Sequence, residues 1–389
     1  MNSLKLGGTP KAAPRSPSAA ARMPPVEAGL SPFPGRWPKA RTPHFLALDG
    51  LRGFAAIVVV LLHICEYFEL PVRPGHGYLA VDFFFMLSGF VVAHAYDDRL
   101  RSGMGVLAFM RVRLIRLYPL VALGVTIGTL ALLARALMGH DISPGSVIAA
   151  GVTNALLLPS PWLVYLRPWA FMVNSPIWSL SYEIWVNGLF ALCFPLFVNR
   201  VLVGVIFVGA VLLVLAGLFF GNLNFGYDWY YFYTGSVRVL FPFFTGILLL
   251  RATRSVTLRT SLGNFVWLPL IVLLAAPAFS GPYYDLAAVL FAFPVIVTVG
   301  AHASPSPRLR RLWTRMGELS FPLYALHFPF VVALSNIAHS RHWAGVQLWA
   351  AAAATFVVVI GIAWAGLMAY DIPARRFLNA WDRRRRAIA

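Results

Sequence analysis

The sequence predicts an all-α polytopic membrane protein with about ten transmembrane helices. Its 389 residues are 59% hydrophobic and 12% charged, whereas an average soluble domain is about 45–50% apolar and about 25% charged. From residue 45 onward the apolar runs reach the length of about 20 residues that a helix needs to cross a bilayer. So little charge excludes a soluble cytosolic enzyme, a disordered protein and an ordinary nucleic-acid-binding domain.

Ten apolar segments are expected to be the membrane-spanning helices. One further apolar run, 146–158, is short for a span and contains Asn154, with Pro159 directly after it. We therefore interpret this run as part of an outer loop, 139–175. The ten expected helices lie near 45–66, 79–95, 117–138, 176–198, 201–220, 235–250, 264–279, 285–301, 319–338 and 346–370.

Basic residues predict the orientation of these helices, because cytoplasmic loops of membrane proteins are enriched in Lys and Arg. With ten helices and the N-terminus inside, most of the 32 Lys and Arg residues fall in cytoplasmic segments. Counting 146–158 as a further span would place the basic residues of 251–259 outside. We therefore expect both termini to be cytoplasmic. The net charge of +18 then reflects orientation and contact with the inner leaflet, not a nucleic-acid partner.

Composition divides the chain into three regions. Residues 1–43 lack the apolar core of a signal peptide and are rich in Pro, Ala and Ser, which is typical of a disordered cytoplasmic tail. Residues 44–370 are expected to form the membrane domain, and 371–389 a basic cytoplasmic tail. Cys65 and Cys193 lie in apolar stretches without CxxC or Cys/His zinc spacing, so neither redox chemistry nor a metal site is expected.

Ionisable residues inside the expected helices are the first candidates for a functional site, because they are costly in a bilayer. Arg52 and His63 are eleven residues apart, which places them on one helix face about 16 Å apart along the axis. Asp49 and Glu66 lie within helical reach of Arg52 and His63 respectively. Alone, Arg52 reads as a snorkelling residue and His63 as an interhelical hydrogen-bonding group. Together on one face they favour a site.

Two further helices carry candidates. Arg113 and Arg116, at i and i+3, can hold an anionic group as a pair, although a topology-setting cluster has the same pattern. Glu183 lies within an otherwise apolar helix, which favours function over packing. Gly89 is expected to allow close helix packing. The residues that could support a site, or simply pack, are Asp49, Asp82, Trp178, Tyr324 and His327.

Four segments then occur in a fixed order: LDGLRGFAAIVVVLLH, VDFFFMLSGF, RLIRLYP with the later WSLSYE, and GELSFPLYALHFP. Together they resemble the acyltransferase-3 family of integral membrane O-acyltransferases, over residues 44–370. The Arg-x10-His element (Arg52, His63) and the Arg-x-x-Arg element (Arg113, Arg116) are marks of that family. The family's ten helices agree with the number that the charge distribution favours.

The resemblance implies transfer of an acyl group, usually acetyl, from cytoplasmic acyl-CoA to a hydroxyl of a cell-envelope or exported carbohydrate or glycolipid. Some members move succinyl groups, and some carry a fused SGNH-type hydrolase domain, which is not expected here. The location it implies is the inner (plasma) membrane, in contact with membrane lipid. Acyl-CoA is a co-substrate, and no permanently bound cofactor, metal or nucleic acid is expected.

The expected site combines these residues. Inner-side arginines are expected to hold the phosphates of CoA: Arg52, Arg113 and Arg116. His63 is expected to act as general base on the acceptor hydroxyl, with an acyl-histidine intermediate as the alternative. Glu66 or Glu183 is expected to orient the imidazole or stabilise its cation. The aromatic outer segments SPWLVYLRPW and FGYDWYYFY are either sugar-stacking surfaces or interfacial aromatic belts.

Two other classes of protein remain alternatives. A transporter or flippase of a lipid-linked or small glycoside also carries intramembrane His, Arg and Glu, but such proteins often show inverted repeats, and none is evident in this sequence. A non-catalytic scaffold that holds anionic lipid on its basic faces is the third hypothesis. A scaffold does not need a deep histidine, and a transporter does not need CoA.

Overall fold

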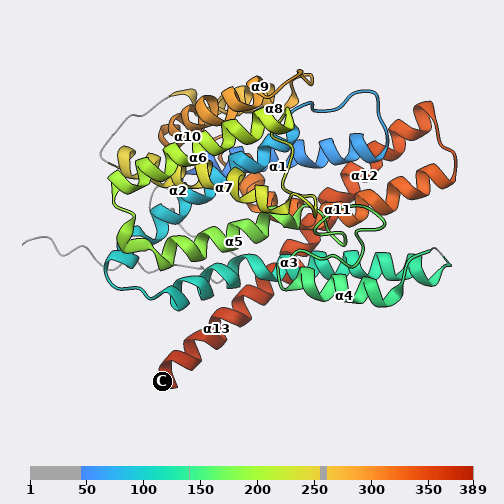
Figure 1. Cartoon of the computed structure of the whole chain (residues 1–389), viewed down its shortest axis with the longest axis horizontal. Coiled ribbons are helices and arrows are strands. Elements are labelled where there is room, and N and C mark those ends of the chain that lie inside the picture. The colour runs from blue at the N-terminus through green and yellow to red at the C-terminus, as the bar shows by residue number, and fades with distance from the viewer. Residues whose placement is uncertain (1–44, 140, 255–260, 389) are drawn as a thin grey trace, which may run out of the picture. The chain divides into compact units, whose positions relative to one another are not determined.

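The computed structural model describes residues 45–139, 141–254 and 261–388. Helices dominate (Figure 1), the described part of the chain contains no β-strand, and one isolated antiparallel bridge joins Trp169 to Asp228. The predicted all-α class is confirmed. The segment 1–43, expected to be disordered, lies outside the described residues.

Every segment expected to span the membrane contains a helix. These helices are α1 (Leu46–Tyr67), α2 (Ala80–Arg101), α3 (Val106–Leu137), α5 (Ile177–Leu192), α6 (Asn199–Phe220), α7 (Gly235–Thr253), α8 (Trp267–Ala275), α9 (Tyr283–Ala287), α10 (Phe293–His302), α11 (Arg310–Ser340) and α12 (Gly345–Ala365). A π-helical turn, Ala288–Ala292, joins α9 to α10, and a second one, Gly366–Asp371, joins α12 to α13 (Ile372–Ile388). The doubtful run 146–158 overlaps α4 (Pro144–Ala155), whose 12 residues are too few to span a bilayer.

Eight helices of the described chain are long and apolar enough to cross a membrane. Two of the ten expected spans are missing from these eight because their helices are short: α5 has 16 residues and α8 has 9 residues. Prolines explain their length: Pro176 and Pro195 flank α5, and Pro277 follows α8. Proline lacks the backbone N–H that a helix uses and disfavours helical geometry in the residue before it.

The directions of α1 and α11 are set by two contacts between them. Arg52 Nε donates to Ser320 Oγ over 2.8 Å, and further along both helices His63 Nδ1 lies 2.8 Å from His327 Nε2. The two helices therefore run parallel. Because Arg52 and His63 both contact α11, the expectation that they share one face of α1 is confirmed.

Contacts along α2 and α7 show that these helices also run parallel. The Asp82–Arg238 ion pair joins their first turns (2.5 Å), and the Asp97–Arg251 ion pair joins them towards their far ends (2.7 Å). Parallel helices must be separated by an odd number of crossings, and α3, α5 and α6 lie between these two in the chain. We infer that α5 crosses the bundle despite its length.

The short helix α8 runs alongside α1 in the same direction. Trp267 at its start stacks on Phe54 of α1, with ring centroids 5.4 Å apart. Near its end, the Leu274 carbonyl accepts a hydrogen bond from the backbone N–H of His76, beyond the end of α1 (3.2 Å). The contacts thus support ten crossings, of which α5 and α8 are the short ones.

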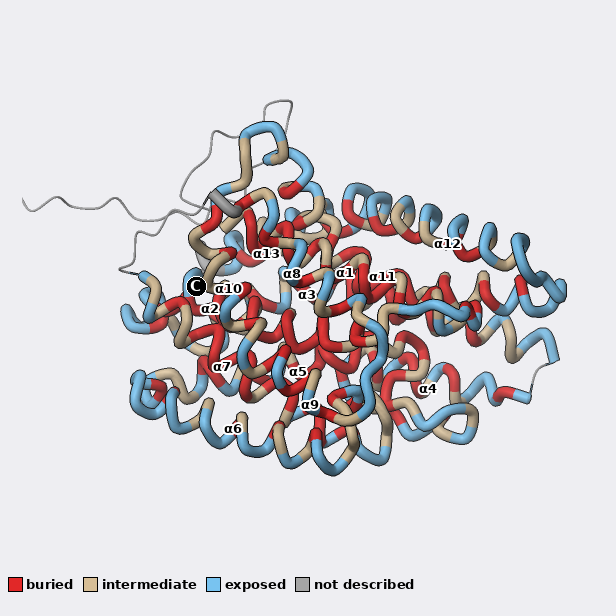
Figure 2. The backbone as a smooth tube through the Cα atoms, turned by 90° about the horizontal axis from the view of Figure 1, so that it is seen from above, coloured by how far each residue is buried: buried red, intermediate tan, exposed pale blue. Residues whose placement is uncertain are grey.

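Glycines let α2 and α7 approach closely. A Cβ atom on Gly89 would lie 1.9 Å from the Phe243 oxygen, and one on Gly246 would lie 2.0 Å from the Met86 oxygen. The predicted role of Gly89 is confirmed, in agreement with the use of small residues at membrane helix contacts. Buried residues gather where α1, α2, α7 and α11 meet, whereas much of α12 is exposed (Figure 2).

Two predicted helix starts are wrong. α3 begins at Val106, not near 117, and α11 begins at Arg310, not near 319. Both extensions carry arginines, and a hydropathy pattern therefore leaves them out of the expected span. A helix can nevertheless continue through arginines whose side chains reach charged partners or water. The basic segment 371–389 is helical as far as Ile388.

Candidate active site

A hydrogen-bonded imidazole pair joins α1 to α11. His63 and His327 lie with ring centroids 5.1 Å apart and planes at 20°. Nδ1 of the fully buried His327 is 2.8 Å and 3.0 Å from the backbone carbonyl oxygens of Leu323 and Tyr324. Carbonyl oxygens only accept, so His327 Nδ1 carries the hydrogen, and Nε2 of the neutral ring holds the lone pair. His63 Nδ1–H therefore donates to His327 Nε2 over 2.8 Å.

This chain of hydrogen bonds fixes the tautomer of His63. Because its Nδ1 carries the hydrogen, its Nε2 holds the lone pair in the neutral ring. No described residue hydrogen-bonds to Nε2, and the side chain is partly exposed. His63 thus presents an unprotonated nitrogen, as a general base requires.

The two carboxylates expected beside His63 contact other residues. Glu66 Oε1 lies 3.9 Å from Arg73 Nη1. Glu183 Oε1 accepts hydrogen bonds from Ser88 Oγ (2.7 Å) and Arg113 Nη2 (2.9 Å). The group that orients the His63 imidazole in this structure is His327, which sequence reasoning placed only among the supporting residues.

Arg52 is held by both its own helix and α11. Its Nε donates to Ser320 Oγ (2.8 Å), and its Nη2 donates to the Gly317 oxygen (3.1 Å). Its Nη2 also lies 3.3 Å from Asp49 Oδ1, so the acidic neighbour predicted from helical spacing is confirmed. These contacts fix the guanidinium at the α11 interface, one end of the face that carries His63.

Around Arg52 the helices assemble a cluster of four arginines, which we call the arginine cluster. Arg116 is close enough to the other three to interact electrostatically, and it is exposed, with no hydrogen bond or ion pair to any described residue. Three buried polar atoms nearby have no partner in the described chain: Arg113 Nε, Asp371 Oδ1 and Arg375 Nε. An exposed cation beside the two unsatisfied guanidinium N–H groups of Arg113 and Arg375 is suited to an anionic ligand. The members of the cluster are Arg52, Arg113, Arg116 and Arg375.

Sequence reasoning missed Arg375, because it counted the basic C-terminal residues only as topology markers. Arg375 Nη2 pairs with Asp371 Oδ2 (2.5 Å), one helical turn earlier. A further ion pair, Arg111–Asp382 (2.7 Å), fastens α13 to α3. The i, i+4 spacing of Asp371 and Arg375, directly after an apolar span, was the available signal.

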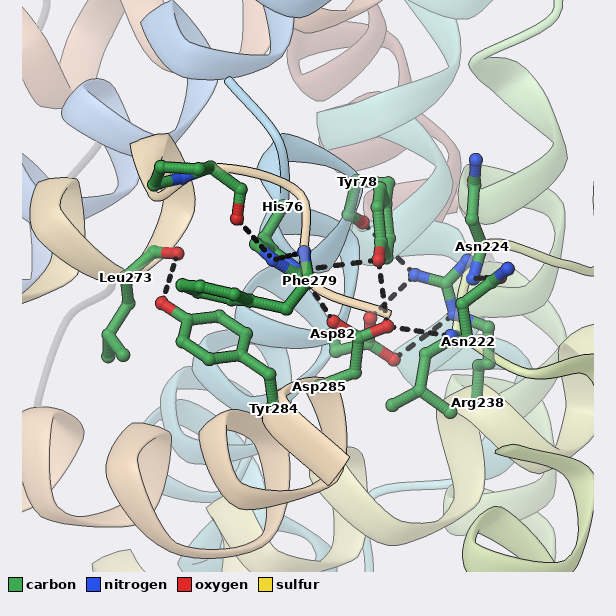
Figure 3. Close-up of polar contacts among 12 residues, drawn as sticks. His76, Tyr78, Asp82, Asn222, Asn224, Arg238, Leu273, Phe279, Tyr284 and Asp285 are labelled. Atoms are coloured by element: carbon green, nitrogen blue, oxygen red, sulfur yellow. Dashed lines mark hydrogen bonds and ion pairs between the residues drawn. The ribbon is translucent and has the colours of Figure 1, made fainter. Parts of the chain in front are cut away.

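Asp82, another supporting candidate, belongs to a fully buried ion pair with Arg238 (Figure 3). Arg238 also donates to the backbone oxygens of Phe225 (2.9 Å) and Tyr78 (3.0 Å). Its guanidinium lies 5.2 Å from the ring centroid of Trp178, which accounts for that supporting candidate. Both carboxylate oxygens of Asp82 and all three guanidinium nitrogens of Arg238 have hydrogen-bond partners, so we assign the pair a role in stability.

Beside it lies a second buried group that sequence reasoning missed. His76 Nδ1 is 2.7 Å from Asp285 Oδ1, and Asp285 Oδ2 accepts from Tyr78 Oη and the Leu223 N–H, both at 2.8 Å (Figure 3). The group ties the segment after α1 to α9 and to the segment after α6. His76 and Asp285 are both 1% exposed and are bonded to described neighbours, so we assign the group a role in stability.

Tyr324, the remaining candidate, connects α11 to the start of α5. Its hydroxyl is 2.6 Å from Ser179 Oγ and donates to the Pro176 oxygen (3.1 Å). Its ring centroid lies 6.2 Å from that of His327. Tyr324 therefore helps to hold the helix that carries the imidazole pair.

Membrane-length helices, an open imidazole nitrogen and a cluster of arginines are together typical of a multi-pass membrane enzyme. The family profile described as an acyltransferase domain matches residues 45–368. The chain belongs to the acyltransferase-3 family, and it is a membrane acyltransferase.

Two curated proteins are similar to parts of the chain. Protein 2 in the picA locus of Rhizobium radiobacter is 39% identical over 157 residues, which cover 38% of this chain and 81% of that protein. Acyltransferase MdmB of Streptomyces mycarofaciens is 34% identical over 164 residues, or 40% of this chain and 39% of that protein. No solved structure matches the chain.

Proposed function

We propose that this acyltransferase moves an acyl group, acetyl in the first instance, from acyl-CoA to a hydroxyl of a cell-envelope or exported carbohydrate or glycolipid. The proposal rests on one observation: the hydrogen bond from His63 Nδ1–H to His327 leaves Nε2 of His63 unprotonated. The enzyme acts in the inner membrane, with the arginine cluster on the cytoplasmic side, where acyl-CoA is available. The family supports O-acyl transfer, and the geometry supports the assignment of roles.

The reaction requires one proton acceptor and no cofactor. His63 Nε2 takes the proton of the acceptor hydroxyl as its oxygen bonds to the thioester carbonyl carbon. The carbon–sulfur bond then breaks, and the thiolate of CoA receives the proton from the His63 imidazolium. The Nδ1–H bond to His327 persists throughout and stabilises the cation, as the orienting partner does in other His-dependent transferases and hydrolases.

The arginine cluster is the proposed site for the phosphates of CoA. Guanidinium groups bind phosphate oxygens through paired, charge-assisted hydrogen bonds. Arg52 and His63 are separated by about 16 Å along α1, so the extended pantetheine arm would link phosphates at one end to a thioester at the other. Binding would also satisfy the orphaned Nε atoms of Arg113 and Arg375.

The first test is transfer of radiolabelled acetyl from acetyl-CoA by membranes that contain the full chain, followed by fractionation of the products. Label in a saccharide or glycolipid fraction is the expected result. A protein that neither transfers acetyl nor binds acetyl-CoA in a filter-binding assay would overturn the proposal.

The arginine cluster predicts a specific effect on donor affinity. Arg116→Ala removes an exposed cation that makes no hydrogen bond or ion pair with any described residue, so we expect the KM for acetyl-CoA to rise about tenfold with kcat nearly unchanged. Arg200→Ala, which removes an exposed charge at the start of α6, is the matched control and should leave both constants unchanged. An unchanged KM in Arg116→Ala would contradict the phosphate role.

The imidazole pair predicts that a hydrogen-bond acceptor at position 327 matters more than the ring itself. His327→Gln keeps a carbonyl oxygen that can accept from His63 Nδ1–H, whereas His327→Leu does not. We expect kcat to fall about tenfold in the glutamine variant and about 100-fold or more in the leucine variant, with both KM values unchanged. Equal losses in the two variants would show that His327 only fills space.

A further inference from the structure

An aromatic box lies next to the imidazole pair. Tyr67 lies one turn beyond His63 on α1, and Phe328 directly follows His327. The Phe328 ring makes edge-to-face contacts with His63 and Tyr67, both at 5.4 Å between centroids, and with Trp169 at 5.9 Å. Trp169 and Tyr67 are 6.5 Å apart. Three aromatic rings from three separate segments therefore meet beside the proposed base.

Trp169 lies in the long segment between α4 and α5, and hydrogen bonds to other segments fix the backbone on both sides of it. The Trp229 N–H donates to the Pro168 oxygen (2.7 Å), and the Ala170 N–H donates to the Tyr227 oxygen (3.0 Å). The Ala170 oxygen in turn accepts from Asn154 Nδ2 on α4 (3.3 Å). The two aromatic outer segments of the sequence thus pair with each other, and together they fix Trp169 at the box.

One polar atom of the box has no partner. The hydroxyl oxygen of Tyr67 is buried, and no described residue hydrogen-bonds to it. A buried hydroxyl without a partner is unfavourable and calls for a ligand or water to satisfy it. Tyr67 follows His63 by one helical turn, a rise of about 6 Å along the axis of α1.

Charged and polar groups surround the aromatic rings. The Arg167 guanidinium lies 4.9 Å from the Trp169 ring centroid, and Arg167 and Glu66 both interact electrostatically with Tyr67. Tyr227 lies outside the spanning helices, and burial, together with the carboxylates of Glu66 and Asp228, raises the pKa of its hydroxyl, which therefore stays protonated as a donor. A saccharide presents both apolar C–H faces and many hydroxyls, which match rings bordered by such groups.

We propose that Trp169 and Tyr67 form the acceptor subsite: a pyranose ring stacks on Trp169, one of its hydroxyls bonds to Tyr67 Oη, and a neighbouring hydroxyl reaches His63 Nε2. This subsite rests on the proposed function. An aliphatic alcohol would leave the Tyr67 hydroxyl unsatisfied and would desolvate Glu66 and Arg167 without compensation. The subsite therefore selects a carbohydrate over a simple lipid alcohol.

The test uses the detergent-purified full chain, radiolabelled acetyl-CoA, a panel of octyl pyranosides and 1-octanol. The wild type is expected to acetylate at least one glycoside and to leave octanol unmodified. For that glycoside, Tyr67→Phe should raise the KM about fivefold, because it removes one hydrogen bond and keeps the ring. Trp169→Ala should raise it at least about tenfold. The KM for acetyl-CoA should stay within about twofold in both variants.

Matched controls come from the same outer segment. Trp162 and Tyr165 are 48% and 60% exposed, and Trp162→Ala and Tyr165→Phe should behave as wild type. Equal glycoside KM values for Trp169→Ala and Trp162→Ala would overturn the subsite, as would acetylation of octanol at the rate of the glycosides. Binding of acetyl-CoA without transfer to any glycoside would overturn the subsite and leave the donor site standing. Absence of both binding and transfer would overturn the proposed function itself.

Discussion

Replacing His63 by alanine is expected to abolish acyl transfer while the protein still inserts and folds. The variant removes the Nε2 that we propose accepts the hydroxyl proton, and general base catalysis contributes about 10²–10⁴-fold to a rate. We expect at least a ~10³-fold fall in the initial rate, because the same ring also contacts the reacting hydroxyl. The measurement is acetyl transfer from acetyl-CoA, made on protein whose size-exclusion profile matches the wild type.

His302 supplies the control for this prediction. It lies at the end of α10, where its Nδ1 is bonded to the Thr298 oxygen (2.8 Å). His302→Ala should retain wild-type activity. If His63→Ala kept more than about a tenth of the activity, the base would have to be another group. Recovery of acetyl bound covalently to wild-type protein, and its loss in His63→Ala, would instead identify an acyl-histidine intermediate.

Arg238→Ala is expected to destabilise the folded protein more than any other single charge removal. It leaves the Asp82 carboxylate buried and unpaired where the first turns of α2 and α7 meet. Breaking one partner of such a pair costs about 3–5 kcal/mol. Thermal unfolding of the detergent-solubilised chain should show the effect as a large drop in Tm or as failure to fold.

Two comparisons make the reason for this loss testable. Arg254→Ala breaks the Arg254–Asp98 pair, in which the Asp98 side chain is 74% exposed, and should cost only about 0–1 kcal/mol. The double variant Asp82→Leu, Arg238→Leu removes both charges and should recover part of the stability lost in Arg238→Ala. A double variant that is less stable than Arg238→Ala would contradict the explanation from an unpaired charge.

The face of α1 that carries the site could be predicted because helical spacing is a local property. Eleven residues between Arg52 and His63 are enough to place both on one face, and the cost of charge in a bilayer marks Glu183 as unusual. The partners could not be predicted. Nothing in the spacing of α1 says that α11 packs beside it in parallel, so the bond from His63 to His327 depends on a contact between segments far apart in the chain.

Charge counting had a similar limit. It used the basic residues to infer orientation and considered only Arg52, Arg113 and Arg116 for a site, so it gave no role to Arg238 or Arg375. Arg238 lies in the first turn of α7, opposite Asp82 in the first turn of α2, and only the parallel packing of these helices brings the two charges together. Arg375 contributes to the arginine cluster only because α13 continues from α12 at a particular rotation.

That rotation is set by the π-helical turn Gly366–Asp371, which holds one residue more than an α-helical turn. The extra residue acts as a phase shift of about 100° for everything C-terminal to it. Deleting one residue here would turn Arg375 away from Arg116 and Asp382 away from Arg111, with no change to any side chain at the site. The composition of the arginine cluster therefore depends partly on the number of residues in this turn, and the turn should tolerate substitution far better than it tolerates insertion or deletion.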